Sequence, residues 1–238
     1  SLVAFAKKIG KTPVVCKDAP GFLVNRILGA YLAEAARILQ EGAGIAKVDQ
    51  ALLDFGMPMG PFNLVDEVGI DVSAKVSHIL EAAFGARMST VDASGANALD
   101  KIVESGRLGK KNGKGFYIYE GKEKKVDESV RQLVGGSVSS SAAPSSSEIQ
   151  DRCVLMMINE AALILAEGIV RRPQDVDAGM IFGAGFPPFR GGLLRYADSL
   201  GIDQLVGKME TLAAKHGERF KPAAWLVEMK GGAKKFYA

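Results

Sequence analysis

The chain has 238 residues, of which 47% are hydrophobic and 24% charged, and its formal net charge is +3. This composition is typical of a globular protein with one large or two small domains. The mild charge argues against nucleic acid as a partner, and no apolar run has the length of a transmembrane segment. Two distant cysteines, Cys16 and Cys153, form no CxxC pattern, which suits a reducing compartment better than a disulfide framework or a zinc site.

The first 18 residues carry one helical pattern followed by one β-rich run. Apolar residues at helical spacing predict a helix over Leu2–Ile9, and residues Thr12–Cys16 predict a strand. A lone strand has no partner with which to form a sheet. Because the first residue is Ser1 and not Met, we expect residues 1–18 to be the helix-strand remnant of a truncated Rossmann-type domain.

The next stretch is the most constrained turn-to-helix signal in the chain. Pro20 fixes its own φ and suits a first helical turn, so we expect a helix from Pro20 to Gly42. A helical wheel puts Asn25 at the rim of the apolar stripe, one position before an outward-facing Arg26. There the Asn25 amide either reaches a ligand or bonds a nearby backbone group, and the helix alone favours the local bond.

Further helices follow at short intervals, which is the pattern of a helical bundle. We expect them over residues 45–55, from Pro61 through Val68, from Asp71 as N-cap to Phe84, and over residues 96–104. A glycine-rich loop then leads to a short extended run over residues 116–119, and the Ser-rich stretch 135–147 predicts a linker. The expected domains are 19–134 and 148–238, on either side of that linker.

The pattern of the first helical domain returns after the linker, at offsets of 126 to 132 residues. The matches are Glu34-Ala35-Ala36 with Glu160-Ala161-Ala162, Phe55-Gly56 with Phe182-Gly183, Pro61-Phe62 with Pro188-Phe189, and Gly69-Ile70-Asp71 with Gly201-Ile202-Asp203. We therefore predict two tandem copies of one helical-bundle unit in a mainly α protein. The counterpart of Asn25 is Asp151, so the shared fold does not require an amide there, which favours a functional role for Asn25.

Several stretches look like phosphate-binding, catalytic or metal-binding motifs, but their residue spacings do not match those motifs. The loop Gly109–Gly115 lacks the spacing and the final Ser or Thr of a phosphate-binding P-loop, and the glycines around Phe186 follow no strand. Neither His78 nor His216 has a carboxylate or serine partner at a recognisable spacing, so we expect no catalytic triad and no metal site. Lys111 either attracts a phosphate or belongs to a solvated basic loop.

Four motifs, in this order, carry a resemblance to a known family. They are the stretch Lys11–Arg26, Met59-Gly60-Pro61-Phe62, Gly113-Lys114-Gly115-Phe116-Tyr117 and Gly185-Phe186-Pro187-Pro188. The chain resembles the C-terminal region of L-3-hydroxyacyl-CoA dehydrogenases, most closely those of the multifunctional fatty-acid β-oxidation type. In that family an NAD-binding domain hands over to helical domains at the first of these motifs.

The resemblance implies an NAD-dependent oxidation of 3-hydroxyacyl-CoA to 3-ketoacyl-CoA. It implies that Asn25 contacts the substrate, that Lys111 approaches the NAD, and that the catalytic His and Glu lie outside these 238 residues, so that the piece is inactive alone. It further implies an upstream NAD-binding domain, a bacterial cytoplasmic location and a thiolase subunit as a partner. The rival hypothesis, which the apolar helix faces fit equally well, is a helical dimerisation or docking module without a ligand of its own.

Overall fold

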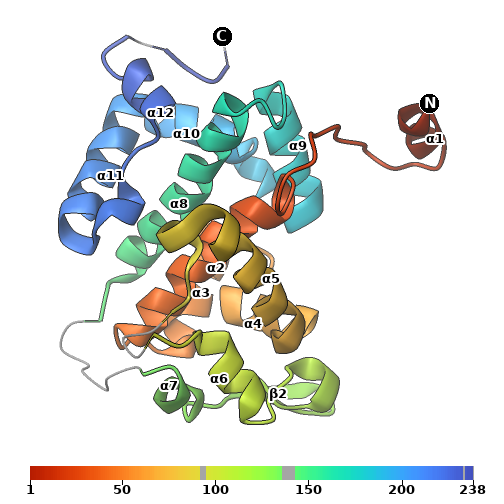
Figure 1. The fold of residues 1–238 in the computed structure, drawn as a ribbon, viewed down its shortest axis with the longest axis vertical. Helices are drawn as coiled ribbons and strands as arrows, with labels where there is room; N and C mark the ends of the chain where they lie inside the picture. The colour runs from red at the N-terminus through yellow and green to blue at the C-terminus, as the bar shows by residue number, and fades with distance from the viewer. Residues whose placement is uncertain (92–94, 136–142, 233, 238) are drawn as a thin grey trace. The chain divides into compact units, whose positions relative to one another are not determined.

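The computed structural model describes residues 1–91, 95–135, 143–232 and 234–237, and these residues are mainly helical (Figure 1). The helices before the Ser-rich stretch are α1 (Leu2–Lys8), α2 (Val24–Gln40), α3 (Ile45–Phe55), α4 (Pro61–Val68), α5 (Ile70–Phe84), α6 (Ala98–Glu104) and α7 (Val130–Leu133). Those after it are α8 (Ser146–Ala166), α9 (Pro173–Ala184), α10 (Leu193–Leu200), α11 (Ile202–His216) and α12 (Ala224–Met229). The predicted fold class, a mainly α protein of repeated helical units, is confirmed.

Short elements connect these helices. The 3-10 turns are η1 (Gly85–Met88), η2 (Lys110–Asn112), η3 (Pro188–Arg190) and η4 (Glu218–Phe220). The strands β1 (Tyr117–Glu120) and β2 (Glu123–Val126) form an antiparallel hairpin in which Tyr117 lies opposite Val126. The hairpin begins where the aromatic run predicts extended backbone, which is a local signal that needs no distant partner.

The described chain forms two compact units. Unit 1 comprises Ser1–Leu28 together with Leu155–Ala238, and unit 2 comprises Gly29–Val154. The boundaries between the units fall within α2 and within α8. The division 19–134 and 148–238 remains a sequence prediction, and most of its linker, residues 136–142, lies outside the described residues. The end of the predicted linker was wrong, because Ser146 and Ser147 already belong to α8.

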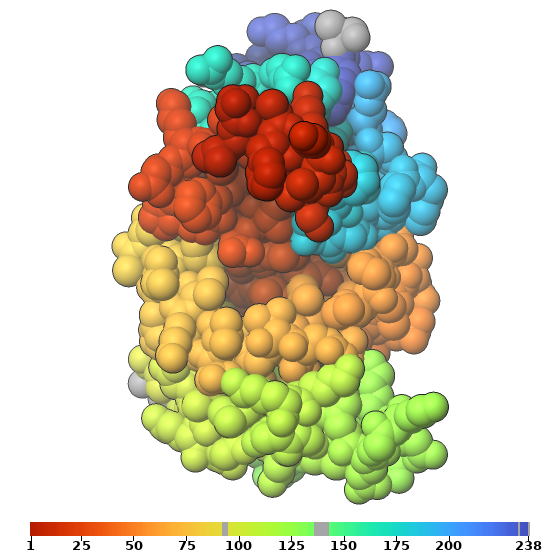
Figure 2. Space-filling view, turned by 90° about the vertical axis from the view of Figure 1, so that its right-hand side faces the viewer, coloured from red at the N-terminus to blue at the C-terminus, as the bar shows by residue number. Residues whose placement is uncertain are grey.

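The segment at the start of the chain differs from its prediction. Residues 12–16 form no strand within the described structure, since a strand requires a paired neighbour. The helix α1 forms as predicted but buries none of its residues, and its apolar side chains Leu2 and Phe5 are 86% and 60% exposed. Figure 2 shows this helix, in red, on the surface that faces the viewer.

Two predicted helix starts were wrong for local reasons. The helix α2 begins at Val24 and not at Pro20, because Gly21 and Phe22 have φ of 73° and 50°. Those values lie in the left-handed region, which a right-handed helix cannot include. The helix α5 begins at Ile70 with Gly69 as N-cap, so Asp71 stands in the first turn and is not the cap.

The repeat is present, but its register shifts within the second copy. Gly56 ends α3 in the left-handed conformation, and Gly185 does the same for α9, whereas Gly183 lies inside α9. The predicted matches to Gly183 and to Pro188 were therefore wrong. The structural counterpart of the helix that starts at Pro61 is α10, and the turn η3 is inserted before it.

A pair of buried aspartates identifies the corrected register. Asp49 accepts hydrogen bonds from the first-turn amides of α4 at 2.9 and 3.1 Å, and Asp177 accepts from those of α10 at 2.7 and 3.3 Å. Tyr117 donates to Asp49 and Tyr237 donates to Asp177, at 2.7 and 2.6 Å. Each copy thus ties two helices and an aromatic segment to one carboxylate, which satisfies helix-end amides that have no partner in the helix.

Candidate functional site

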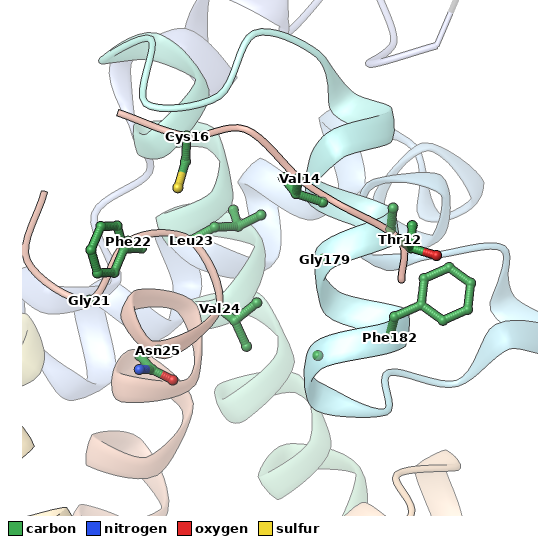
Figure 3. Close-up of a pocket in the computed structure, with 12 residues that line it drawn as sticks. Thr12, Val14, Cys16, Gly21, Phe22, Leu23, Val24, Asn25, Gly179 and Phe182 are labelled. Carbon is green, nitrogen blue, oxygen red and sulfur yellow. The ribbon is translucent and has the colours of Figure 1, made fainter. Parts of the chain in front are cut away.

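A pocket of about 320 Å³ opens in unit 1 between three segments of the chain (Figure 3). The segments are the extended residues 12–16, the turn 21–25 at the start of α2, and residues 178–183 of α9. Val14, Phe22 and Phe182 give it an apolar lining, while Cys16 and Asn25 add polar atoms. An apolar pocket with few polar groups is the usual form of a small-molecule site.

The predicted substrate contact Asn25 lines this pocket. It is the second residue of α2, and its side chain is exposed. It follows the left-handed turn at Gly21 and Phe22, and the 50° φ of Phe22 is unfavourable for a side chain of that size. An asparagine amide both donates and accepts hydrogen bonds, so this position can serve either a carbonyl or a hydroxyl of a ligand.

The helix α9 approaches the turn closely because it presents glycine where a side chain would collide. A Cβ added to Gly179 would lie 2.5 Å from Leu23, and one added to Gly183 would lie 2.9 Å from Val24. Leu23 itself is only 3% exposed. The turn that precedes Asn25 therefore packs into a surface of the second copy that two glycines leave open.

The prediction that Arg26 faces outward was wrong. Its side chain is 1% exposed, and it donates to Glu160 at 2.6 Å and to both oxygens of Glu167 at 2.5 and 2.8 Å. Burial alone would lower the pKa of Arg26, but the bonds to the two carboxylates outweigh it, so the pKa is raised and the guanidinium stays charged. A helical wheel of α2 does not show this, because the partners of Arg26 are Glu160 of α8 and Glu167, which directly follows α8.

The predicted cofactor contact Lys111 lies in unit 2, on the turn η2. Its ammonium forms an ion pair with Asp71, in the first turn of α5, and both side chains are partly exposed. The hydrogen bond from Lys111 lowers the pKa of the Asp71 carboxyl below its usual value. Asn25 and Lys111 thus lie in different compact units.

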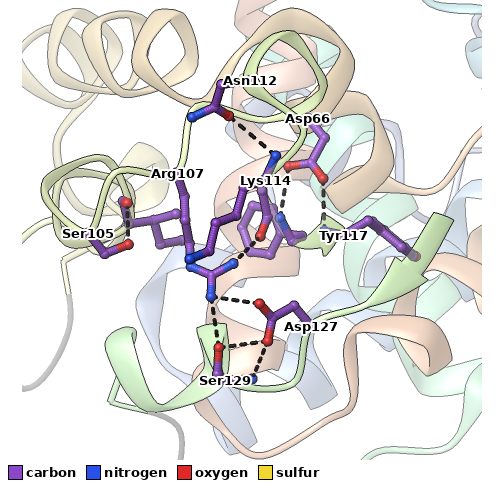
Figure 4. Close-up of polar contacts among 11 residues, drawn as sticks. Asp66, Ser105, Arg107, Asn112, Lys114, Tyr117, Asp127 and Ser129 are labelled. Atoms are coloured by element: carbon purple, nitrogen blue, oxygen red, sulfur yellow. Dashed lines mark hydrogen bonds and ion pairs between the residues drawn. The ribbon is translucent and has the colours of Figure 1, made fainter. Parts of the chain in front are cut away.

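The loop around Lys111 is fixed by buried polar contacts, which Figure 4 shows. Arg107, 5% exposed, donates to the carbonyl of Gly115 at 2.9 Å, to Asp127 at 2.6 Å and to Ser129 at 2.8 Å. Asp66 accepts from the backbone amides of Phe116 and Tyr117. A loop held at so many points keeps a defined shape, in contrast to a freely solvated basic loop.

The histidine prediction needs one correction. His78 of α5 lies 2.8 Å from Asp100 of α6, a partner that its sequence spacing did not indicate. Both side chains are about half exposed, at 53% and 40%, so the contact is a surface ion pair at most. Among the described residues, no group of three or more His, Cys, Asp or Glu is placed to hold a metal ion.

Within the described residues, no helix combines the length and the apolar character of a membrane-spanning segment.

Comparison with known proteins gives matches along nearly the whole chain. The family model described as 3-hydroxyacyl-CoA dehydrogenase, C-terminal domain, matches residues 21–119 and 149–236. The protein named fatty acid oxidation complex subunit alpha from Vibrio vulnificus is 49% identical over 237 residues, which are 100% of this chain and 33% of that protein. Its namesake from Shewanella amazonensis is 50% identical over 238 residues, 99% of this chain and 33% of that protein.

Solved structures give the same result for the fold. The 3-hydroxybutyryl-CoA dehydrogenase of Escherichia coli has a TM-score of 0.74 and 25% identity, over 95% of this chain and 63% of that one. The dehydrogenase part of multifunctional enzyme 1 from C. elegans has a TM-score of 0.69 at 23% identity, over 95% and 52%, which is evidence for the fold alone. This chain spans about a third of the length of its curated relatives. With two separate matches that cover most of its residues, the chain belongs to the family of 3-hydroxyacyl-CoA dehydrogenase C-terminal domains.

Proposed function

We propose that this chain is the C-terminal part of an NAD-dependent L-3-hydroxyacyl-CoA dehydrogenase of fatty-acid β-oxidation. The whole enzyme oxidises the C3 hydroxyl of its substrate to a ketone, with hydride passing to NAD and a proton released. The chain contributes to the wall of the substrate site and holds no catalytic residue of its own. Its membership in the C-terminal domain family supports this division of labour.

The observation that carries the proposal is the placement of Asn25 at the pocket. The amide is exposed at the start of α2, whereas the next residue, Arg26, is buried. A helix start held by its neighbours is a rigid platform for a polar group that must meet a substrate atom. We assign Asn25 to hydrogen bonding with the oxygen at the reacting end of a 3-hydroxyacyl or 3-ketoacyl chain, which the apolar lining would surround.

For NAD, we propose that this chain supplies one contact and that another domain binds most of the cofactor. The loop that carries Lys111 is ordered by Arg107 and Asp66, and an exposed ammonium there suits the phosphates of a dinucleotide. Lys111 would exchange its bond with Asp71 for one with a phosphate. The described residues form no dinucleotide-binding sheet, so we propose that an upstream domain holds most of the cofactor and supplies the hydride acceptor and the catalytic His and Glu.

Two further proposals concern the setting of the enzyme. The relatives are named as subunits of a complex, which supports a partner subunit, and we propose a thiolase that takes the 3-ketoacyl product. Bacterial relatives support a cytoplasmic location. The alternative function, a docking module without a ligand, is favoured by the exposed apolar side chains of α1, Leu2 and Phe5, and the experiment below separates the two.

The test uses the full-length gene product and measures NADH oxidation with acetoacetyl-CoA. We expect Asn25→Asp to lower kcat about 100-fold, because the carboxylate keeps the shape of the side chain but can no longer donate a hydrogen bond. Asn25→Ala should lose at least as much. The matched control is Asp151→Asn, which makes the reverse change at the equivalent position of the second copy and should leave kcat unchanged.

Two results would remove the proposal. Absence of turnover in the wild-type full-length protein would favour the docking module. Turnover of Asn25→Asp and Asn25→Ala at the wild-type rate would take Asn25 out of the site. Equilibrium binding of acetoacetyl-CoA to the same variants gives a readout that does not depend on turnover.

A further inference from the structure

Two buried arginine clusters repeat in the chain, one in each compact unit. In the Arg26 cluster, Arg26 contacts Glu160 and Glu167 of the second copy. In the Arg152 cluster, Arg152 contacts Glu34 and Glu41 of the first copy. Every member of one cluster stands 126 residues from its counterpart in the other. The arginine of each copy is therefore paired with glutamates of the other copy, and each copy neutralises the buried charge of the other.

The two clusters match closely in geometry. Arg26 holds both oxygens of Glu167 at 2.5 and 2.8 Å, and Arg152 holds both oxygens of Glu41 at 2.5 and 2.8 Å. The arginines are 1% and 0% exposed, and these two glutamates are 43% and 39% exposed. Bidentate pairs of this kind fix direction as well as distance. Glu34 also contacts Arg37 at 3.6 Å.

The clusters differ in what their arginine anchors. Arg152 lies well inside α8, which begins at Ser146. Arg26 lies in the first turn of α2, which begins at Val24 directly after the left-handed turn. First-turn amides have no partner earlier in the same helix, and here the amide of Arg26 instead donates to the carbonyl of Gly21 at 3.1 Å. A cation there also meets the positive end of the helix dipole, and only its carboxylate partners make this position favourable.

We propose that Arg26 is a positioning residue for Asn25. Held by Glu160 and Glu167, it fixes the first turn of α2 and thereby sets the direction of the amide that precedes it in the chain. The second helical copy thus contributes to the reaction without touching the substrate. This inference rests on the proposed function of Asn25, and the counterpart cluster, whose arginine follows Asp151 inside a helix, carries no such role.

The test compares Glu167→Gln with Glu41→Gln in the full-length protein. Each change removes one charge from a partly exposed carboxylate and leaves the buried partner of the arginine in place, so both should cost similar stability. We expect Glu167→Gln to lower kcat for NADH oxidation with acetoacetyl-CoA by tenfold or more, up to the roughly 100-fold that a displaced reacting group can cost. Glu41→Gln should leave kcat within about twofold of wild type, because the arginine that Glu41 holds stands beside no residue assigned to the substrate.

A double variant separates positioning from a general loss of structure. If Arg26 acts through the amide, Glu167→Gln should have no further effect on kcat once Asn25→Ala has removed that amide. Should Glu167→Gln fail to fold, Glu167→Asp against Glu41→Asp keeps the charges and shortens the reach, and the same comparison applies.

The outcomes distinguish this inference from the proposed function. If Asn25→Ala loses turnover but Glu167→Gln and Glu41→Gln behave alike, the positioning role is overturned and the proposed function stands. The positioning role also falls if the full effect of Glu167→Gln persists in the Asn25→Ala background. If the wild-type protein has no turnover, or if Asn25→Ala retains it, both are overturned.

Discussion

Replacing Gly60 with alanine should destabilise unit 2 through a single steric overlap. A Cβ at this position would lie closer than 3.0 Å to the Cα, Cβ and Cγ of Asp49, a separation that real Cβ atoms essentially never show. One of those atoms belongs to the backbone of α3, so no change of rotamer removes the overlap. Gly60 has φ of −71° and ψ of 162°, which alanine adopts freely, so the whole effect comes from the collision and not from backbone strain.

The expected magnitude follows from what must move. Overpacking in a close-packed interior costs about 1–3 kcal/mol. Separating α3 from α4 also weakens the bonds that Asp49 accepts from Phe62, Asn63 and Tyr117, at 2.9, 3.1 and 2.7 Å. A buried acceptor left short of partners costs roughly 1–3 kcal/mol more. We therefore expect the free energy of unfolding to fall by about 2–6 kcal/mol, out of the 5–15 kcal/mol typical of a domain.

Gly44→Ala provides the matched control. Gly44 is likewise the N-cap of a helix in unit 2, with φ of −75° and ψ of 146°, and it has no side-chain cap bond. An added Cβ there would meet its nearest neighbour, Glu128, at 4.0 Å. Its stability should stay within about 1 kcal/mol of wild type. Urea unfolding followed by circular dichroism measures both. Equal losses in the two variants would refute the steric argument and point to a general cost of alanine at these helix starts.

Three further predictions concern other parts of the chain. Gly207→Ala in α11, where an added Cβ meets nothing within 4 Å, should raise the free energy of unfolding by about 0.5–1 kcal/mol in urea unfolding. Burial and the nearby Asp49 raise the pKa of Tyr117 above its usual 10.0, so above pH 10 the folded state keeps this proton while the unfolded chain loses it, and the free energy of unfolding falls as pH rises. Tyr117→Phe should reduce the slope of that fall by up to ~1.4 kcal/mol per pH unit when unfolding is measured between about pH 9 and 11. Lys111→Ala should raise the KM for NADH and leave kcat nearly unchanged in steady-state kinetics, because a phosphate contact far from the hydride binds ground state and transition state equally.

The elements that the sequence predicted well are those with local signals. The helix over residues 45–55 is found at those bounds, with Gly56 as its left-handed end, because apolar spacing and a glycine stop act within the segment itself. Pro61 opens α4 as predicted, since its fixed φ and missing N–H suit a first turn. Neither prediction depended on residues far away in the chain.

Features that depend on distant partners were not predictable in this way. Arg26 lies on an apparently exposed face until Glu160, more than a hundred residues later, is placed beside it. The bond between His78 and Asp100 likewise requires two helices to pack before the residues meet. A helical wheel contains no information about what covers the other face.

In the repeat, aligning the two copies by residue type gave a wrong register, whereas aligning them by the contact that each residue makes gives the correct one. Matching Pro61 to Pro188 by residue type aligned the start of α4 with the inserted turn η3 and not with the start of α10. The reliable signal was an aspartate followed by a glycine with no room for a side chain, Asp49 with Gly60 and Asp177 with Gly192. In both copies the carboxylate comes so close to the residue before the helix that an added Cβ there would overlap it, so these two positions take glycine although the residues after them differ.

The exchanged arginine clusters explain why the second copy cannot be treated as an independent appendage. Removing Glu160 and Glu167 would leave Arg26 buried and uncompensated, which costs several kcal/mol, and the same holds for Arg152 without Glu34 and Glu41. The copies differ at the neighbouring position, where one has Asn25 and the other a carboxylate. Each buried arginine is neutralised by its own two glutamates. The residue before each arginine takes no part in these ion pairs, so it can differ between the copies. If Asn25 meets the substrate as proposed, the first copy supplies that amide and the second copy supplies the carboxylates that hold the helix start carrying it.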